Sequence, residues 1–211
     1  MINFYMTPGS CSTGIHILLE ELELVFGATL VNLLAGDQYR PEFVAINPRS
    51  TIPVVVLDDG QALTSFQGIC WWLALNHPKA KLLPESIVAQ AQALDLMGYI
   101  VNTIHGEGYT RIFTPAVYQS GNEFSEQDTE ALKKQGETIV AKGLELVSGY
   151  LDKDGRCLTS NLNVVDAALF YVEFWTVKSK LPLPERCLLH YQWMTKRPAV
   201  QRVLAEEGYR I

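Results

Sequence analysis

The sequence lacks any apolar run of the roughly 18–20 residues that a membrane-spanning helix needs. Its first residues contain neither the basic nor the apolar region of a signal peptide. The cysteines are few and far apart, with no C-x-x-C and no histidine at ligand spacing, which argues against a disulfide scaffold or a zinc site. We therefore expect a cytoplasmic protein with reduced thiols, no metal ion and no membrane contact.

The chain also lacks the basic surface that nucleic acids require. Its 17 Lys and Arg against 23 Asp and Glu give a formal net charge of -6, and no Lys/Arg cluster occurs. Because phosphate contacts need a basic face, no nucleic-acid partner is expected. The hydrophobic share of 48% and the charged share of 19% are ordinary for a globular protein, and 211 residues suffice for two modest cores.

The first eighty residues change their hydrophobic period repeatedly. Apolar β-rich runs predict strands at residues 2–5, 28–34, 52–57 and 61–64. Helical spacing predicts helices at residues 11–24, 41–46 and 68–75. The order β-α-β-α-β-β-α is that of a thioredoxin-like domain, in which a right-handed crossover gives parallel pairing.

Beyond residue 78 the pattern becomes helical. A proline-bounded stretch at residues 79–85 predicts a linker between a domain of residues 1–78 and an all-helical domain of residues 86–211. Helices are predicted at residues 86–117, 125–151, 164–178, 185–195 and 198–206. Asn163 with Asp166 three residues later predicts a capping box at the third of them. The fold class is thus α/β followed by all-α.

Five short stretches, spread in order over nearly the whole chain, resemble the bacterial, beta-like branch of the glutathione S-transferase superfamily. They are P-G-S-C-S after the first strand (8–12), N-P-R-S-T-I-P (47–53), L-T-S-F-Q-G-I (63–69), N-V-V-D-A (163–167) and K-R-P-A-V (196–200). The resemblance implies an N-terminal domain that binds glutathione as co-substrate, a helical domain that forms an electrophile pocket, and a homodimer. The family usually has Glu at the position of Ser65, Ser at that of Phe66 and often Lys at that of Gly106.

Cys11 and Ser12 are the candidate catalytic residues. They follow a Pro-Gly turn at the expected start of a helix, where unpaired amides and the helix dipole favour an anion such as a thiolate. Either Ser12 and the amides donate to the sulfur of glutathione, or Cys11, with a lowered pKa, forms a mixed disulfide with it. The structural alternative makes Cys11 a small packing residue. Cys70 and Cys187 are expected to be buried, and Cys157 partly exposed.

The resemblance also implies the glutathione-binding residues. Pro53 corresponds to a cis proline, which leaves the backbone of Ile52 free to pair with an extended peptide. Ser65 and the amide of Phe66 correspond to the γ-glutamyl site, although Ser65 is equally well explained as a helix cap and Phe66 as a core residue. Gln38 and Arg49 are candidates for the glycyl end, or solvated surface residues.

The first long helix is expected to face the cleft. Its polar and aromatic stripe gives four candidates for the electrophile pocket: Asn102, His105, Tyr109 and Arg111. A stripe of this kind is also typical of plain core packing.

Taken together, these features predict an enzyme that adds or exchanges the glutathione thiol on a small electrophile, as in detoxification. Two rivals remain open at this point. One is a non-catalytic binding or regulatory protein of the same fold, and the other is a specialised biosynthetic enzyme with a modified glutathione site.

Overall fold

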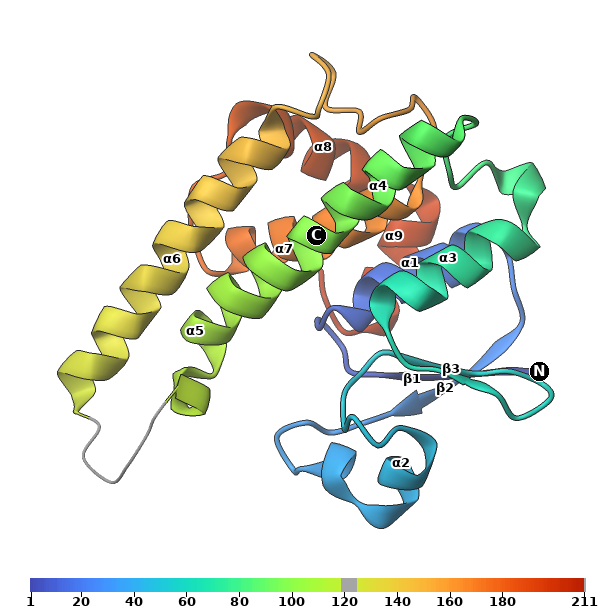
Figure 1. Cartoon of the computed structure of the whole chain (residues 1–211), viewed down its shortest axis with the longest axis horizontal. Helices are drawn as coiled ribbons and strands as arrows, with labels where there is room; N and C mark the ends of the chain where they lie inside the picture. Colours follow the sequence, from blue (N-terminus) through green and yellow to red (C-terminus); the bar gives the residue numbers. More distant parts are fainter. Residues whose placement is uncertain (119–124, 211) are drawn as a thin grey trace.

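A computed structural model describes residues 1–118 and 125–210 of the chain (Figure 1). The N-terminal part follows the predicted order of strands and helices. Its elements are β1 (Ile2–Met6), α1 (Ser12–Glu21), β2 (Phe26–Leu30), α2 (Pro41–Ile46), β3 (Val54–Val56), β4 (Ala62–Leu63) and α3 (Phe66–Asn76), with a 3-10 turn at Asp37–Tyr39.

The four strands form one mixed sheet in the order β2-β1-β3-β4. β1 pairs in parallel with β2 and antiparallel with β3, so that Phe4 lies opposite Ala28 on one side and Val55 on the other. Helices α1 and α3 cover one face of the sheet, and α2 covers the other (Figure 1). Val54 and Val55 are fully buried, as the apolar run predicted. This arrangement confirms the thioredoxin-like prediction.

Three predicted strands are shorter than expected, and β4 spans only Ala62–Leu63 rather than residues 61–64. β2 ends at Leu30 rather than at residue 34, because the chain turns away after Val31 donates to the carbonyl of Met6. β3 begins at Val54 rather than at residue 52, because Pro53 has no N–H to donate to a sheet.

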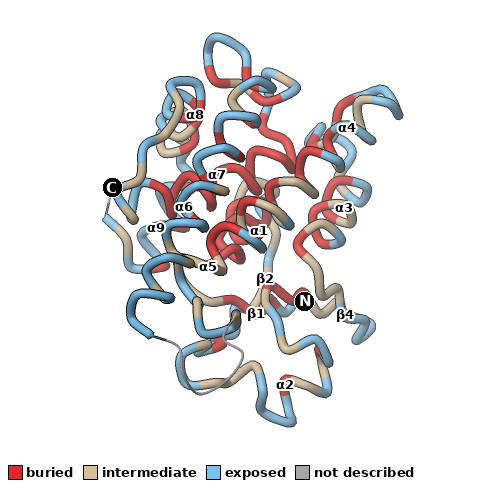
Figure 2. The backbone as a smooth tube through the Cα atoms, turned by 60° about the vertical axis from the view of Figure 1, so that its left-hand side comes forward, coloured by how far each residue is buried: buried red, intermediate tan, exposed pale blue. Residues whose placement is uncertain are grey.

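The other elements that the structure describes are helices and helical turns. They are the 3-10 turn Pro78–Ala80, α4 (Ile87–Tyr99), a π-helix (Ile100–Tyr109), α5 (Thr110–Phe113), the 3-10 turn Pro115–Tyr118, α6 (Glu126–Ser148), α7 (Val164–Lys178), α8 (Glu185–Thr195) and α9 (Pro198–Glu206). Every residue of α7 from Val164 to Thr176 is buried, and α1, α3, α4, α8 and the π-helix pack against it (Figures 1 and 2). No described helix is long and apolar enough to cross a bilayer.

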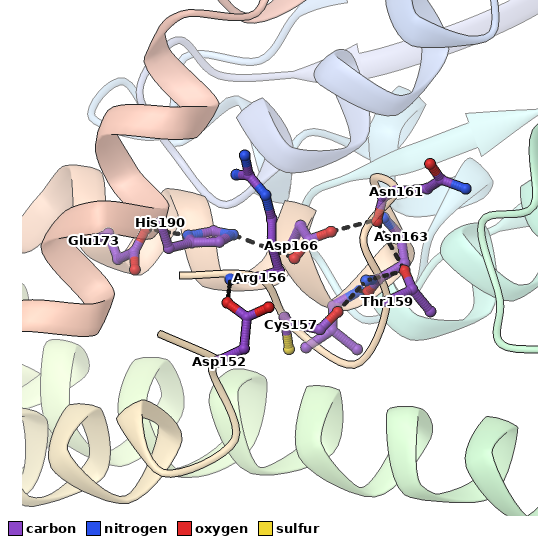
Figure 3. A network of polar contacts seen from close by, with 10 residues as sticks. Asp152, Arg156, Cys157, Thr159, Asn161, Asn163, Asp166, Glu173 and His190 are labelled. Carbon is purple, nitrogen blue, oxygen red and sulfur yellow. Dashed lines mark hydrogen bonds and ion pairs between the residues drawn. The ribbon is translucent and has the colours of Figure 1, made fainter. Parts of the chain in front are cut away.

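The capping box at the start of α7 is present as predicted. The Asn163 side chain accepts a hydrogen bond from the Val165 N–H (2.9 Å), and the Asp166 carboxylate accepts one from the Asn163 N–H (2.7 Å; Figure 3). The side chains of α1, α3 and α7 pack in one continuous core that includes Ile15, Ile69 and Phe170. The division into residues 1–78, 79–85 and 86–211 stays a prediction.

The helix predicted over residues 86–117 is interrupted by the π-helix. The Thr110 N–H bonds the carbonyl of His105, five residues back, so the turn is wider than in an α-helix. Segments of this kind occur frequently at functional sites. Here it carries His105 and Tyr109.

Candidate active site

Eight of the twelve predicted site residues line two adjoining hollows between the sheet domain and the helices; Ser12, Gln38, Asn102 and Arg111 do not. Both are lined by Cys11, Thr51, Ile52 and His105. The larger hollow, of about 450 Å³, adds Pro8, Gly9, Ser10, Leu33, Ser50, Tyr109, Thr110, Phe113, Thr114 and Trp175. The smaller one, of about 190 Å³, adds Arg49, Pro53, Thr64, Ser65, Phe66, Gln67, Val101 and Tyr171.

Cys11 lies where the two hollows meet. Gly9, in the left-handed region at φ 70°, turns the chain from β1 toward α1 and so brings Cys11 to the start of that helix. The residue is only 8% exposed, and its thiol donates to the carbonyl of Ile52 (3.6 Å). Burial raises the pKa of the Cys11 thiol to about 12, although the backbone amides of Cys11 and Ser12 lower it.

The expected lowering of the Cys11 pKa is therefore wrong. Removing the thiolate from water costs more than the helix-start amides recover, so Cys11 is a neutral thiol at pH 7. Cys70 and Cys187 are buried as predicted, but Cys157, expected to be partly exposed, has no exposed surface.

This protonation state gives a direct prediction for alkylation. At pH 7.5 we expect iodoacetamide to modify Cys11 at least about tenfold more slowly than free cysteine, because only a small fraction is thiolate. The rate, followed by peptide mass spectrometry, is expected to rise steadily with pH through pH 9. A fast rate that is independent of pH above 7 would contradict the neutral thiol.

Ser12 does not line the cleft. It is fully buried, and its hydroxyl donates to the carbonyl of Thr7 (3.0 Å) and accepts from the Thr7 N–H (3.1 Å). The hydroxyls of Ser10 and Ser12 are 2.7 Å apart, and it is Ser10 that lines the larger hollow. Ser12 thus holds the turn after β1, since its hydroxyl is bonded inside that turn.

The Ile52–Pro53 peptide bond is cis, as the resemblance implied. The carbonyl of Ile52 accepts the Cys11 thiol, while its N–H has no partner among the described residues. The main chain at Ile52 therefore offers a free donor at the junction of the two hollows.

Ser65 is a helix cap and Phe66 is a core residue, as the structural alternative for each of them held. The Ser65 hydroxyl accepts from the Gly68 N–H (3.0 Å) and caps α3. Phe66 is 4% exposed and packs edge-on against Tyr171, with ring centroids 5.4 Å apart. Both still line the smaller hollow, where the first amides of α3 have no partner within the helix.

Arg49 and Gln38 differ in position. Arg49 is exposed and lines the smaller hollow. Gln38 lines neither hollow; its amide nitrogen donates weakly to the carbonyl of Leu33 (3.5 Å), and it is Leu33 that reaches the larger hollow.

His105 borders both hollows. Its Nδ1 lies 3.2 Å from the Tyr171 hydroxyl, and its ring packs edge-on against Trp175 at 4.9 Å. Burial lowers the pKa of His105 to about 4, so the imidazole is neutral at pH 7 and can both donate and accept a hydrogen bond.

Of the other helix candidates, only Tyr109 reaches the cleft. Its ring lines the larger hollow, while its hydroxyl is bonded to Thr176 (2.6 Å) and its pKa is raised by burial. Asn102 is exposed and outside both hollows. The wider π turn rotates it further away from the face of His105, where Val101 lies. Arg111 donates to the carbonyl of Glu107 (2.7 Å) and to Tyr118 (3.1 Å), away from the cleft.

Comparison with known proteins agrees with this geometry. The family model described as the glutathione S-transferase N-terminal domain matches residues 9–75. Glutathione S-transferase GstA of Escherichia coli O157:H7 is 30% identical over 98% of this chain and 99% of its own length. The chain belongs to the glutathione S-transferase family.

Solved structures agree on the fold of this chain. A glutathione transferase homologue from Sulfitobacter, described with bound glutathione, superposes with a TM-score of 0.88 at 24% identity over 99% of both chains. The bacterial beta-class enzyme of Sphingomonas chungbukensis gives a TM-score of 0.81 at 24% identity over 98% of both chains. The relative from Escherichia coli confirms the predicted family, and these structures confirm the predicted fold.

Sequence reasoning missed the contribution of α7 to the cleft. Trp175 is 9% exposed, lines the larger hollow, and its indole N–H donates to the carbonyl of Gly9 (2.7 Å). Tyr171, four residues earlier, lines the smaller hollow. The four-residue spacing of two aromatics on α7 is the signal in the sequence, but it is indistinguishable there from core packing.

A second missed residue, Glu207, holds the Cys11 loop from the far end of the chain. Its side chain is 1% exposed, and the carboxylate accepts from the Gly9 N–H and the Thr13 hydroxyl, both at 2.7 Å. It also lies 2.9 Å from Nδ1 of His16 on α1. Both the N–H and the C=O of Gly9 are thus bound by residues of the helical part, Glu207 and Trp175.

Proposed function

We propose that the protein is a glutathione transferase that binds glutathione as co-substrate and transfers its thiol to a small electrophile. The observation that carries the proposal is the double cleft: a smaller polar hollow and a larger aromatic one meet at Cys11, in a chain of this family. Two substrates that must react with each other require two adjoining sites.

In this proposal glutathione extends along the Ile52 backbone, with its N–H donor pairing to the peptide. The γ-glutamyl end lies in the smaller hollow against Ser65 and the first amides of α3, near Arg49. This places the sulfur at the start of α1, next to Ser10 and Cys11, where the helix amides favour a thiolate.

Cys11 acts as a hydrogen-bond donor to that thiolate. A neutral thiol with a pKa of about 12 is a poor nucleophile but keeps its proton beside an anion. His105 is neutral and lines the same hollow as Cys11, so it is the second polar group available to the reacting atoms. The electrophile occupies the larger hollow against Tyr109, Phe113 and Trp175.

The test is binding and turnover together. Calorimetry is expected to give one glutathione site per chain, and thiol consumption in the presence of a chloronitroarene is expected to be catalysed. Cys11→Ala is expected to lower kcat/KM about tenfold, because it removes one hydrogen bond worth about 1–1.5 kcal/mol, and Cys11→Ser to restore most of it. Glutathione binding without turnover would contradict the transferase.

We also propose that the enzyme is a cytoplasmic homodimer. The family resemblance supports the homodimer. The free, buried cysteines support the cytoplasmic location. Light scattering is expected to give about twice the chain mass of 23.6 kDa, and the mass of a single chain would contradict the dimer.

A further inference from the structure

A histidine and two glutamates gather where α1 and α9 pack against each other. His16 and Glu20 lie one turn apart on α1, and therefore on the same face of that helix, while Glu206 is the last residue of α9. One ligand atom of each side chain lies within 4.8 Å of those of the other two. None of the three residues lines either hollow, so this cluster is separate from the cleft.

The spacing within the cluster is that of ligands around one metal ion. Nε2 of His16 lies 3.3 Å from Oε2 of Glu206, but it forms no hydrogen bond with Glu206 or with any other residue that the structure describes. Bonds of about 2.0–2.2 Å to a tetrahedral zinc ion place two ligand atoms about 3.3–3.6 Å apart. A divalent ion therefore fits between these two atoms at the separation they already have. Glu20 is close enough to complete a three-ligand site by a change of its side-chain torsions.

The imidazole of His16 is held with Nε2 toward the two glutamates. The residue is 4% exposed, and its Nδ1 lies 2.9 Å from the buried carboxylate of Glu207, which the Gly9 N–H and the Thr13 hydroxyl hold in place. When Nδ1 donates its proton to Glu207, Nε2 presents a lone pair to Glu206. A lone pair beside a carboxylate is a repulsive contact that a cation relieves. A histidine bonded to a carboxylate through its other nitrogen is also the usual arrangement at a metal ion.

The donor set and the exposure of the cluster indicate the class of ion. One imidazole nitrogen and two carboxylate oxygens suit Zn²⁺, whereas Ca²⁺ and Mg²⁺ prefer oxygen ligands alone. The side chain of Glu206 is 52% exposed, so an ion reaches the cluster from solvent. Arg202 competes for the site, because it donates to Oε2 of Glu20 (2.7 Å), but its side chain is 57% exposed and is free to turn into water.

We propose that His16, Glu20 and Glu206 bind one Zn²⁺, or a divalent ion with the same ligand preference, and that Glu207 orients the histidine for it. Water fills the remaining position of the ion. The inference does not depend on glutathione binding. The spacing of cysteines and histidines in the sequence does not show this site, because it uses no cysteine and takes one ligand from the last helix.

The test is a calorimetric titration of the metal-free protein with Zn²⁺ in the absence of glutathione. We expect one ion per chain. Glu206→Gln keeps the size of the side chain but removes its charge, and is expected to bind Zn²⁺ at least about tenfold more weakly. Arg202→Ala frees Glu20 from its competing partner and is expected to bind Zn²⁺ at least about threefold more tightly.

Glu23→Gln is the matched control, since Glu23 is an exposed carboxylate just beyond the end of α1 and outside the cluster. It is expected to bind Zn²⁺ within about twofold of the wild type. Paramagnetic Co²⁺ identifies the histidine: in NMR spectra the ring signals of His16 are expected to broaden before those of the other three histidines.

The absence of a heat of Zn²⁺ binding in both the wild type and Arg202→Ala would overturn the inference and leave His16 as a structural partner of the two C-terminal glutamates. Equal affinity of Glu206→Gln and the wild type, or earlier broadening of another histidine by Co²⁺, would place the ion elsewhere and overturn it too.

Discussion

Replacing Glu207 with alanine is expected to lower kcat/KM for glutathione transfer about 100-fold. The carboxylate touches neither hollow, but it binds the Gly9 N–H and the Thr13 hydroxyl, on either side of Cys11. Without the carboxylate the Gly9 N–H loses its hydrogen-bond partner, and we expect the Cys11 loop to shift. A displacement of about 1 Å at the reacting groups lowers the rate about 100-fold.

The chain offers close controls for Glu207. Glu206 is the neighbouring carboxylate; its side chain is 52% exposed and lies 3.3 Å from Nε2 of the same His16. Glu206→Ala is expected to leave kcat/KM within about twofold of the wild type, since exposed ion pairs contribute little. Glu207→Gln keeps an oxygen acceptor for Gly9 and is expected to recover at least about tenfold over Glu207→Ala.

A positioning role for Glu207 further predicts that kcat falls more than KM for glutathione rises. If Glu207→Ala lowers the melting temperature but leaves kcat unchanged, the residue only stabilises the fold.

Replacing His190 with alanine is expected to lower the free energy of unfolding by about 3–5 kcal/mol. The imidazole is fully buried between Glu173 (2.7 Å from Nδ1) and Asp166 (3.2 Å from Nε2), and Asp166 also caps α7 (Figure 3). Without the imidazole the buried Glu173 loses its partner and the buried Asp166 keeps only the Asn163 N–H, and removing one partner of a buried ion pair is costly. For a chain of this size the melting temperature should fall by roughly 6–20 °C.

The same cluster predicts a pH dependence. Burial alone lowers the pKa of His190, but Glu173 and Asp166 outweigh it and raise the pKa to about 10. Because the folded pKa lies above the unfolded value of about 6.5, the contribution is complete below pH 6.5 and is lost as the pH rises toward 10.

Denaturant unfolding at pH 6 and pH 9.5 measures this loss. The difference between wild type and His190→Ala is expected to be larger at pH 6, while the half-buried His77 gives a control variant with little effect at either pH. An equal difference at the two pH values would contradict the charged imidazole.

The hydrophobic periodicity of the sequence predicted the fold well, because the spacing of apolar residues reflects which face of each helix or strand is buried. The Val-rich run became the buried strand β3, and the Asn163–Asp166 spacing became the capping box of α7. The π-helix was not predictable in this way, since the apolar pattern of residues 100–109 fits an α-helix equally well. That one difference explains why Asn102 was placed in the cleft and lies outside it.

The site was only partly predictable. Cys11, Ile52 and His105 line the cleft; the turn after β1 and the helical stripe are local signals for two of them, while the cis proline was implied by the family resemblance. Glu207 and Trp175 reach the Cys11 loop from more than 160 positions away along the chain, and local patterns do not encode such contacts. The pKa of Cys11 was mispredicted for the same reason, since the burial that raises it comes from the tertiary fold.

A crystal of this protein grown with glutathione tests the account most directly. We expect the peptide to lie along the Ile52 backbone, with its γ-glutamyl end at Ser65 and Arg49. Its sulfur should lie within hydrogen-bond distance of Ser10 or Cys11, facing the hollow of Tyr109, Phe113 and Trp175. Glutathione bound elsewhere, or a cleft still empty at saturating glutathione, would contradict the assignment of this cleft as the active site.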